Sequence, residues 1–148
     1  MPILSDCHGA TTSGGGFVNC LFADARREFL ALRKDGGEDF AKWSAIEHEA
    51  SQQVTHIKSV LNDYETIAND IESGILDERF YFSQIRGATL ADYRAAKSFI
   101  VSWRNRQNPQ YWVGFERLAE RWEAIQPGKF PGVRLRERLF DTRPMIRS

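Results

Sequence analysis

The sequence has little cysteine and no excess of charge. Cys7 and Cys20 are its two cysteines, and no CxxC pair is present. We therefore expect free thiols in a reducing cytosol rather than a disulfide framework or a zinc site. Twenty basic and twenty acidic residues cancel, which excludes an overall field that would draw the chain to nucleic acid or to an anionic membrane.

Long hydrophobic runs are also missing. The first sixteen residues lack the basic start of a signal peptide. The run FVNCLFA is far shorter than the ~20 residues that a membrane span requires. We predict a soluble, cytoplasmic protein with no membrane partner. Glycine, serine and threonine dominate residues 9–16, so residues 1–16 are predicted to form a flexible leader.

The usual catalytic motifs are absent as well. GxGxxG, GxxxxGK[ST], GxSxG, HExxH and the ExxH pairs of dinuclear carboxylate bundles do not occur. We therefore assign no catalytic, cofactor-binding or metal-ligating residue and predict no cofactor. A metal-dependent or other enzyme stays open as a third hypothesis, with Glu49, His56 and Glu65 as its residues.

What the sequence does contain is apolar residues at helical spacing. In residues 17–34 they fall on one face of a predicted amphipathic helix. Ser44 with Glu47 has the form of a capping box. The long helix behind it carries an apolar seam that recurs every three or four residues, and Gly74 suits its end. The seam consists of Val54, Ile57, Leu61, Tyr64, Ala68, Ile71 and Ile75.

Three further helices are predicted in the second half. Asp77 is a candidate N-cap for a short helix that ends at Gly87. Thr89 begins another helix, and Asn108 followed by proline marks the start of the last. No segment is rich enough in β-branched residues to require a sheet. The prediction is an all-α, single-domain bundle of about five helices with short loops.

The bundle is predicted to occupy residues 17–126, and a basic segment follows it. Residues 127–148 hold six basic and two acidic side chains, a net charge of +4. We expect this C-terminal segment to pack on the bundle or to be flexible. Within it, residues 133–140 have the pattern of a short helix or an edge strand.

Packing and capping residues between 61 and 118 form a further pattern. They are Leu61-Asn62, Tyr64-Glu65, Ile67-Ala68, Ile71, the run Gly74-Ile75-Leu76-Asp77-Glu78, Ile100, Arg104, Tyr111 and Phe115-Glu116-x-Leu118. On these residues the segment resembles domain-of-unknown-function family 4760, an uncharacterised prokaryotic family. The resemblance implies a helical fold in bacterial or phage biology, including defence, and no activity. Members often carry a transmembrane helix ahead of the domain, where this chain has the charged helix 17–34.

The leading functional hypothesis is a soluble, non-enzymatic helical module that binds another protein or self-associates. Trp43 and Trp112 are the candidate anchors because large aromatic side chains dominate protein interfaces. The tail supplies further candidates, which are Arg134, Arg136 and Arg138. The alternative hypothesis is nucleic-acid binding through the basic tail together with Arg94, Lys97 and Arg104.

Glu65 is the acidic residue closest to the predicted seam. It follows Tyr64 at the seam's edge, where a carboxylate is partly removed from water and needs a partner. We expect a buried ion pair between Glu65 and either Arg104 or Arg117. The other acids of residues 61–78, apart from the candidate N-cap Asp77, are predicted to lie on solvated helix flanks.

Overall fold

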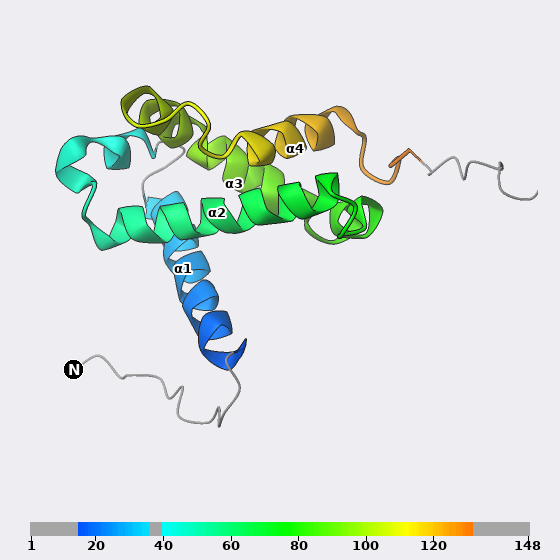
Figure 1. Ribbon diagram of the computed structural model, residues 1–148, viewed down its shortest axis with the longest axis horizontal. Helices are drawn as coiled ribbons and strands as arrows, with labels where there is room; N and C mark the ends of the chain where they lie inside the picture. The colour runs from blue at the N-terminus through cyan, green and yellow to red at the C-terminus, as the bar shows by residue number, and fades with distance from the viewer. Residues whose placement is uncertain (1–14, 36–39, 132–148) are drawn as a thin grey trace, which may run out of the picture.

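Four α-helices make up most of the described chain (Figure 1). The structure is a computed structural model that describes residues 15–35 and 40–131, with side chains for 23–34 and 40–131. No strand occurs in these residues, so the all-α prediction is confirmed. The helices are α1 (Gly15–Asp35), α2 (Gln52–Glu72), α3 (Glu78–Arg106) and α4 (Val113–Ala124), with the 3-10 helices η1 (Ala41–Ser44) and η2 (Ile46–His48) ahead of α2.

The helices α2, α3 and α4 form the body of the molecule. In Figure 1, α2 and α4 lie side by side and run in the same direction, while α3 runs back behind them. Helix α1 packs on α2, and its N-terminal part projects away from the other helices (Figure 1). Helix α3 also contacts η1.

The core is apolar and rich in aromatic side chains. The predicted seam of α2 is buried from Val54 to Ile71, whereas Ile75 lies beyond the end of the helix and is 72% exposed. Phe115 and Trp122 of α4 are fully buried in the same core. Each fully buried large apolar side chain stabilises the fold by about 1.5–3 kcal/mol.

Two predicted helix boundaries between α2 and α3 are confirmed. Gly74 has a φ of 76°, the left-handed conformation that glycine adopts without strain. Asp77 is the N-cap of α3, and its side chain accepts a hydrogen bond from the Phe80 N–H at 3.1 Å. The α2–α3 turn is therefore specified by local sequence.

The predicted helix end at Gly87 is wrong, and this reduces the expected five helices to four. Helix α3 continues through Gly87, whose φ is not in the left-handed region. Thr89, predicted to begin a new helix, is instead buried inside α3, as is Asp92. Glycine permits a helix end but does not impose one, and the apolar residues on both sides of Gly87 pack on the same core.

Two predicted helix starts are also corrected. The Ser44 hydroxyl donates to the Ala41 carbonyl, and Ser51 caps α2 instead by accepting from the Val54 N–H at 3.3 Å. Asn108 forms a turn in which its Oδ1 accepts from the Gln110 N–H. Helix α4 begins several residues later, after Trp112 with its φ of 53°. Residues 1–14 of the predicted leader and residues 133–140 lie outside the described residues, whereas Gly15 and Gly16, predicted to belong to the leader, begin α1.

Candidate functional site

Asp92 of α3 is a fully buried carboxylate where α1, α2 and α3 meet. Arg26 and Arg33 of α1 both form ion pairs with it. The Arg33 Nη1 donates to Asp92 Oδ1 at 2.7 Å, and the Tyr64 hydroxyl of α2 donates to Oδ2 at 2.7 Å. Because a buried charge requires partners, this cluster joins the three helices. Sequence reasoning missed it; the available signal was two arginines seven residues apart on one helix face.

Tyr64 lies between the opposite charges of this cluster. The Arg26 Nη1 donates to the Tyr64 hydroxyl oxygen at 2.8 Å, while the hydroxyl donates to Asp92. Burial raises the pKa of Tyr64 well above its usual value, and the Asp92 carboxylate raises it further through its charge and hydrogen bond. Burial and the Glu116 carboxylate raise the pKa of Tyr93 in the same way.

The protein is expected to lose stability above about pH 10, and Tyr64→Phe is expected to remove part of that loss. Below that pH the Tyr64 phenol is protonated in both the folded and the unfolded protein, so its contribution to the free energy of unfolding is fully present. Above it the unfolded chain releases the proton and the folded protein retains it until the raised pKa is reached. Stability therefore falls by up to about 1.4 kcal/mol per pH unit for each such tyrosine.

Urea denaturation of the wild type and Tyr64→Phe between about pH 8 and about pH 11 measures this slope. The exposed Tyr111 supplies the matched control, Tyr111→Phe, which removes a hydroxyl of the same kind from the surface. An alkaline slope that is the same in Tyr64→Phe as in the control contradicts the prediction.

Glu65 of α2 caps the N-terminus of α4. Its Oε1 accepts the Gly114 N–H at 3.1 Å, and its Oε2 accepts the Phe115 N–H at 2.7 Å. A carboxylate in this place satisfies two N–H groups that helix geometry leaves open, and its charge is favourable at the positive end of the helix dipole. Gly114 permits the approach, since a Cβ there would lie 3.0 Å from Glu65 Oε1.

The expected ion pair of Glu65 with Arg104 or Arg117 is therefore corrected. The Arg104 Nη1 lies 2.6 Å from Glu116 Oε2, and the Arg117 Nη2 lies 3.1 Å from Glu72 Oε2. Backbone N–H donors take the place of the expected cation. Sequence spacing does not reveal them, because they come from a helix 49 and 50 residues away.

The two candidate tryptophan anchors differ in exposure. Trp112 is 2% exposed, and its Nε1 donates to Asn62 Oδ1 at 2.8 Å. Trp112 therefore covers the core, and its ring is not exposed for a partner to contact. Trp43 is half-buried, with its ring 5.1 Å from the ring of His48. The tail candidates Arg134, Arg136 and Arg138 lie outside the described residues.

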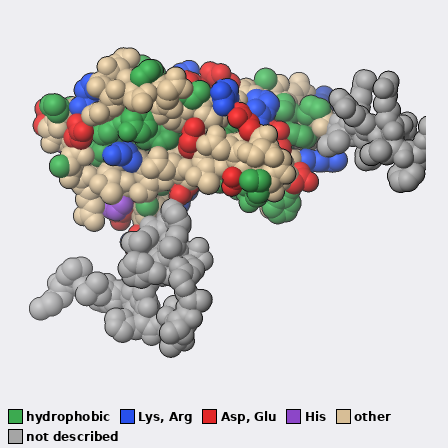
Figure 2. Space-filling view, viewed as in Figure 1, with side chains coloured by type: hydrophobic (Ala, Val, Ile, Leu, Met, Phe, Trp, Pro, Cys, Tyr) green, Lys and Arg blue, Asp and Glu red, His purple; other side chains and the backbone are tan. Residues whose placement is uncertain are grey.

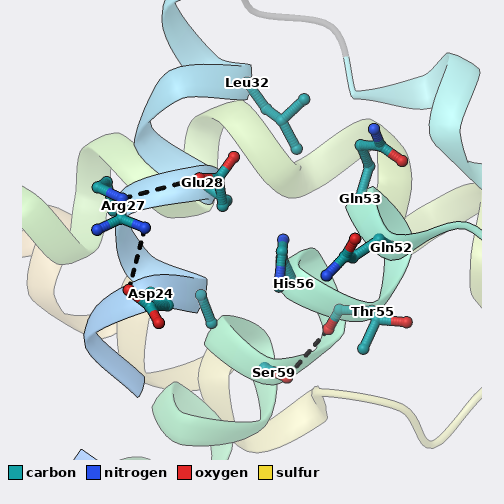
Figure 3. A pocket seen from close by; sticks show the side chains of 10 residues that line it. Asp24, Arg27, Glu28, Leu32, Gln52, Gln53, Thr55, His56 and Ser59 are labelled. Atoms are coloured by element: carbon teal, nitrogen blue, oxygen red, sulfur yellow. Dashed lines mark hydrogen bonds and ion pairs between the residues drawn. The ribbon is translucent and has the colours of Figure 1, made fainter. Parts of the chain in front are cut away.

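A solvent-open cavity of about 670 Å³ lies between α1 and the first half of α2 (Figure 3). His56 of α2 points into it from one side, and Asp24, Arg27 and Glu28 lie on the α1 side. The Arg27 Nη2 is 3.0 Å from Asp24 Oδ1, and its Nε is 3.7 Å from Glu28 Oε1. One guanidinium against two carboxylates leaves these three rim residues with a net charge of −1, so the cavity offers hydrogen-bonding groups with only a small excess of negative charge.

The residues of the metal hypothesis are not brought together. Glu49 accepts hydrogen bonds from Arg106 and Gln107, while Glu65 caps α4. His56 and Glu65 are nine positions apart on α2, which is about 13 Å along the helix axis. No group of three His, Cys, Asp or Glu side chains suited to a metal ion occurs in the part of the chain that the structure describes.

The α3 residues of the nucleic-acid hypothesis are engaged within the molecule. The Arg94 Nη2 lies 2.7 Å from Glu123 Oε1, and Arg104 pairs with Glu116. The Lys97 Nζ lies 5.9 Å from the centre of the Tyr93 ring. Neighbouring carboxylates thus reduce the positive field of both arginines.

Large apolar side chains are exposed where α2 passes into α3. Ile75 is 72% exposed and Phe80 is 59% exposed, and we call this pair the α2–α3 corner. Figure 2 shows hydrophobic side chains gathered at this end of the molecule. Ile46 is equally exposed, at 74%, but it lies on η2 at the opposite end (Figure 1).

A groove of about 540 Å³ lies at the same end, between the first turns of α3 and the segment after α4. We call it the Gly87 groove; it is lined by Arg79, Phe82, Ser83, Arg86, Gly87, Pro127, Gly128 and Phe130. The rings of Phe82 and Phe130 lie 4.9 Å apart. A glycine inside a helix costs roughly 0.5–1 kcal/mol relative to alanine.

These observations define a helical domain whose polar groups mainly hold its own helices together. Residues 16–122 match the family described as Domain of unknown function (DUF4760), and the chain belongs to this family. The match extends beyond residues 61–118, on which the resemblance was based. No curated protein and no solved structure matches the chain. Among the described residues, no helix combines the length and the apolar character needed to cross a membrane.

Proposed function

We propose that this protein is a single-domain, cytoplasmic, non-enzymatic module that binds a different protein through the α2–α3 corner. The observation that carries the proposal is the exposure of Ile75 and Phe80 at one end of a domain whose other large apolar residues are mostly buried. Exposed apolar side chains that lie next to a groove are typical of protein-binding surfaces.

The polar side chains support a binding role over an enzymatic one. Asp92 is held by arginines, Glu65 caps α4, and Glu78 accepts from Arg121 and from the Trp122 Nε1. Groups used in this way are not free to act as a general acid or base. The pairing of Arg94 and Arg104 with carboxylates likewise favours a protein partner over nucleic acid.

Affinity capture from the native host with the full chain, followed by mass spectrometry and measurement with the purified partner, tests the proposal. We expect the double variant Ile75→Ser/Phe80→Ser to bind the partner at least tenfold more weakly, because apolar anchors carry most of an interface's affinity. Ile46→Ser is the matched control and should bind like the wild type, since it removes an equally exposed side chain at the opposite end.

Two results contradict the proposal. One is a partner that binds the double variant as tightly as it binds Ile46→Ser. The other is light scattering that shows the wild type as a dimer and the double variant as a monomer, which would assign the corner to a second copy of this chain. Urea denaturation of both variants checks that the substitutions leave the fold intact.

A further inference from the structure

We propose that the Gly87 groove binds a short acidic segment of a partner protein that inserts one large apolar side chain. The inference rests on the proposed function, because it names the chemistry of the partner that such a module takes. It concerns a different set of residues from the α2–α3 corner, so the two can fail separately.

The first argument is the pairing of the arginines. Every arginine with a described side chain, apart from Arg79 and Arg86, forms an ion pair with a described carboxylate. Arg79 and Arg86 line the same groove, and none of the described residues that line it is acidic. The groove therefore presents two guanidinium groups and no carboxylate in its described lining, and an acidic ligand supplies that carboxylate.

The second argument is the geometry of Arg86. Its Nε donates to the Trp122 carbonyl at 3.1 Å and its Nη2 donates to the Ile125 carbonyl at 2.9 Å, at the end of α4. Its guanidinium also lies 5.4 Å from the centre of the Phe82 ring. These contacts hold the cation beside the apolar floor of the groove before any ligand arrives, which lowers the entropy cost of binding.

The third argument is the glycine itself. Gly87 lies inside α3 with ordinary helical geometry, and a Cβ added there would meet no atom within 4 Å. Neither backbone conformation nor internal packing requires a glycine at a position where it destabilises the helix. The missing side chain instead leaves the groove open beside Phe82 and Phe130, where an apolar side chain from outside fits.

Charge argues against the chain's own C-terminal segment as the occupant. The chain beyond the groove walls, residues 131–148, carries five basic and two acidic side chains, so its net charge has the same sign as Arg79 and Arg86 and does not complement them. An acidic segment from a separate protein is the complementary partner.

Fluorescence anisotropy with the full chain tests the inference. The probe is a short labelled peptide rich in aspartate and glutamate around a single phenylalanine. Two matched peptides carry glutamine and asparagine in place of the acids, or serine in place of the phenylalanine. We expect the first probe to bind at least tenfold more tightly than either matched peptide and to weaken as salt is raised.

Variants of the groove separate binding from folding. Gly87→Gln fills the groove with a good helix former, so it should bind the acidic probe at least tenfold more weakly while melting no lower than the wild type. Gly87→Ala should bind within about twofold of the wild type and melt about 2–6 °C higher. Arg79→Glu should also lose at least tenfold in affinity, because it reverses a charge that forms no ion pair with a described residue.

Several outcomes overturn the inference. They are equal binding of the acidic and the neutral probes, unchanged binding by Gly87→Gln, and single-stranded DNA that binds the groove more tightly than the acidic peptide. If the captured partner depends on Ile75 and Phe80 but not on Gly87 or Arg79, the proposed function stands and this inference is wrong. If the acidic probe binds in the groove and the Ile75→Ser/Phe80→Ser variant binds the captured partner as tightly as the wild type, this inference stands and the proposed function is wrong.

Discussion

Asp92→Asn is expected to lower the free energy of unfolding by about 3 kcal/mol, the largest effect of any single polar substitution in this domain. The carboxylate is fully buried and balances Arg26 and Arg33. Removing one member of a buried ion cluster leaves the others without compensation, at a cost of about 3–5 kcal/mol. We take the lower end because side chains of both arginines are about one-third exposed and so keep part of their hydration.

Urea denaturation monitored by circular dichroism measures the loss, which corresponds to a fall in melting temperature of about 6–12 °C. Glu123→Gln is the matched control, since it removes one negative charge from an exposed pair with Arg94. The control should leave the free energy of unfolding almost unchanged, because exposed ion pairs contribute little to stability. If Asp92→Asn unfolds at the same urea concentration as the control, the cluster does not hold α1 to the body formed by α2, α3 and α4.

A double-mutant cycle sharpens this prediction. Arg33→Ala should destabilise the wild type, because Asp92 then loses one of its two cations. In the Asp92→Asn background the same substitution should be neutral or stabilising, because it removes a cation that no longer has a partner. Equal costs of Arg33→Ala in both backgrounds would mean that the two side chains are not energetically coupled.

Glu65→Ala is expected to lower the free energy of unfolding by about 2 kcal/mol, with the loss concentrated in α4. The substitution removes both acceptors of the Gly114 and Phe115 N–H groups and the negative charge at the helix N-terminus. Glu65→Gln keeps one acceptor oxygen and should lose about half as much. Neither change touches the α2–α3 corner, so partner binding by the folded protein should be unchanged.

Hydrogen exchange of the α4 amides, together with urea denaturation, measures the effect of Glu65. Glu72→Gln is the control, because Glu72 forms an exposed pair with Arg117 on the same helix pair. Gly114→Ala tests the contact from the other side, since its Cβ would lie 2.9 Å from Asn69 Oδ1 and 3.0 Å from Glu65 Oε1. The double variant Glu65→Ala/Gly114→Ala should lose less unfolding free energy than the two single variants lose together. Unchanged protection of α4 in Glu65→Ala would exclude the capping role.

Local sequence predicted the helical elements well where neighbours within one or two turns decide the structure. The seam from Val54 to Ile71, the left-handed Gly74 and the Asp77 cap each depend on residues close in the chain. The prediction failed at Gly87, where a locally plausible stop lies inside a helix. The flanking apolar residues pack on one core, and tertiary contacts override the weak preference of a single glycine.

The candidate site depended on contacts that the sequence does not encode locally. Arg33 and Asp92 are 59 residues apart, and Glu65 meets α4 across 49 and 50 residues. The spacing identified Glu65 as a carboxylate that needs a partner, but it did not show that its partners are the backbone N–H groups of Gly114 and Phe115. In the same way, nothing in the sequence distinguishes Arg79 and Arg86 from the arginines that form ion pairs.

The sequence by itself thus determined an all-α chain, the apolar face of each main helix and the turn at Gly74, because helix periodicity and capping are local properties. Only the tertiary structure decided which charges are paired, that Trp112 is buried, and that two arginines without an ion pair among the described residues lie in one groove with Gly87. The physical reason is that burial and ion pairing depend on which helix faces pack together, and that choice is made by the whole core at once.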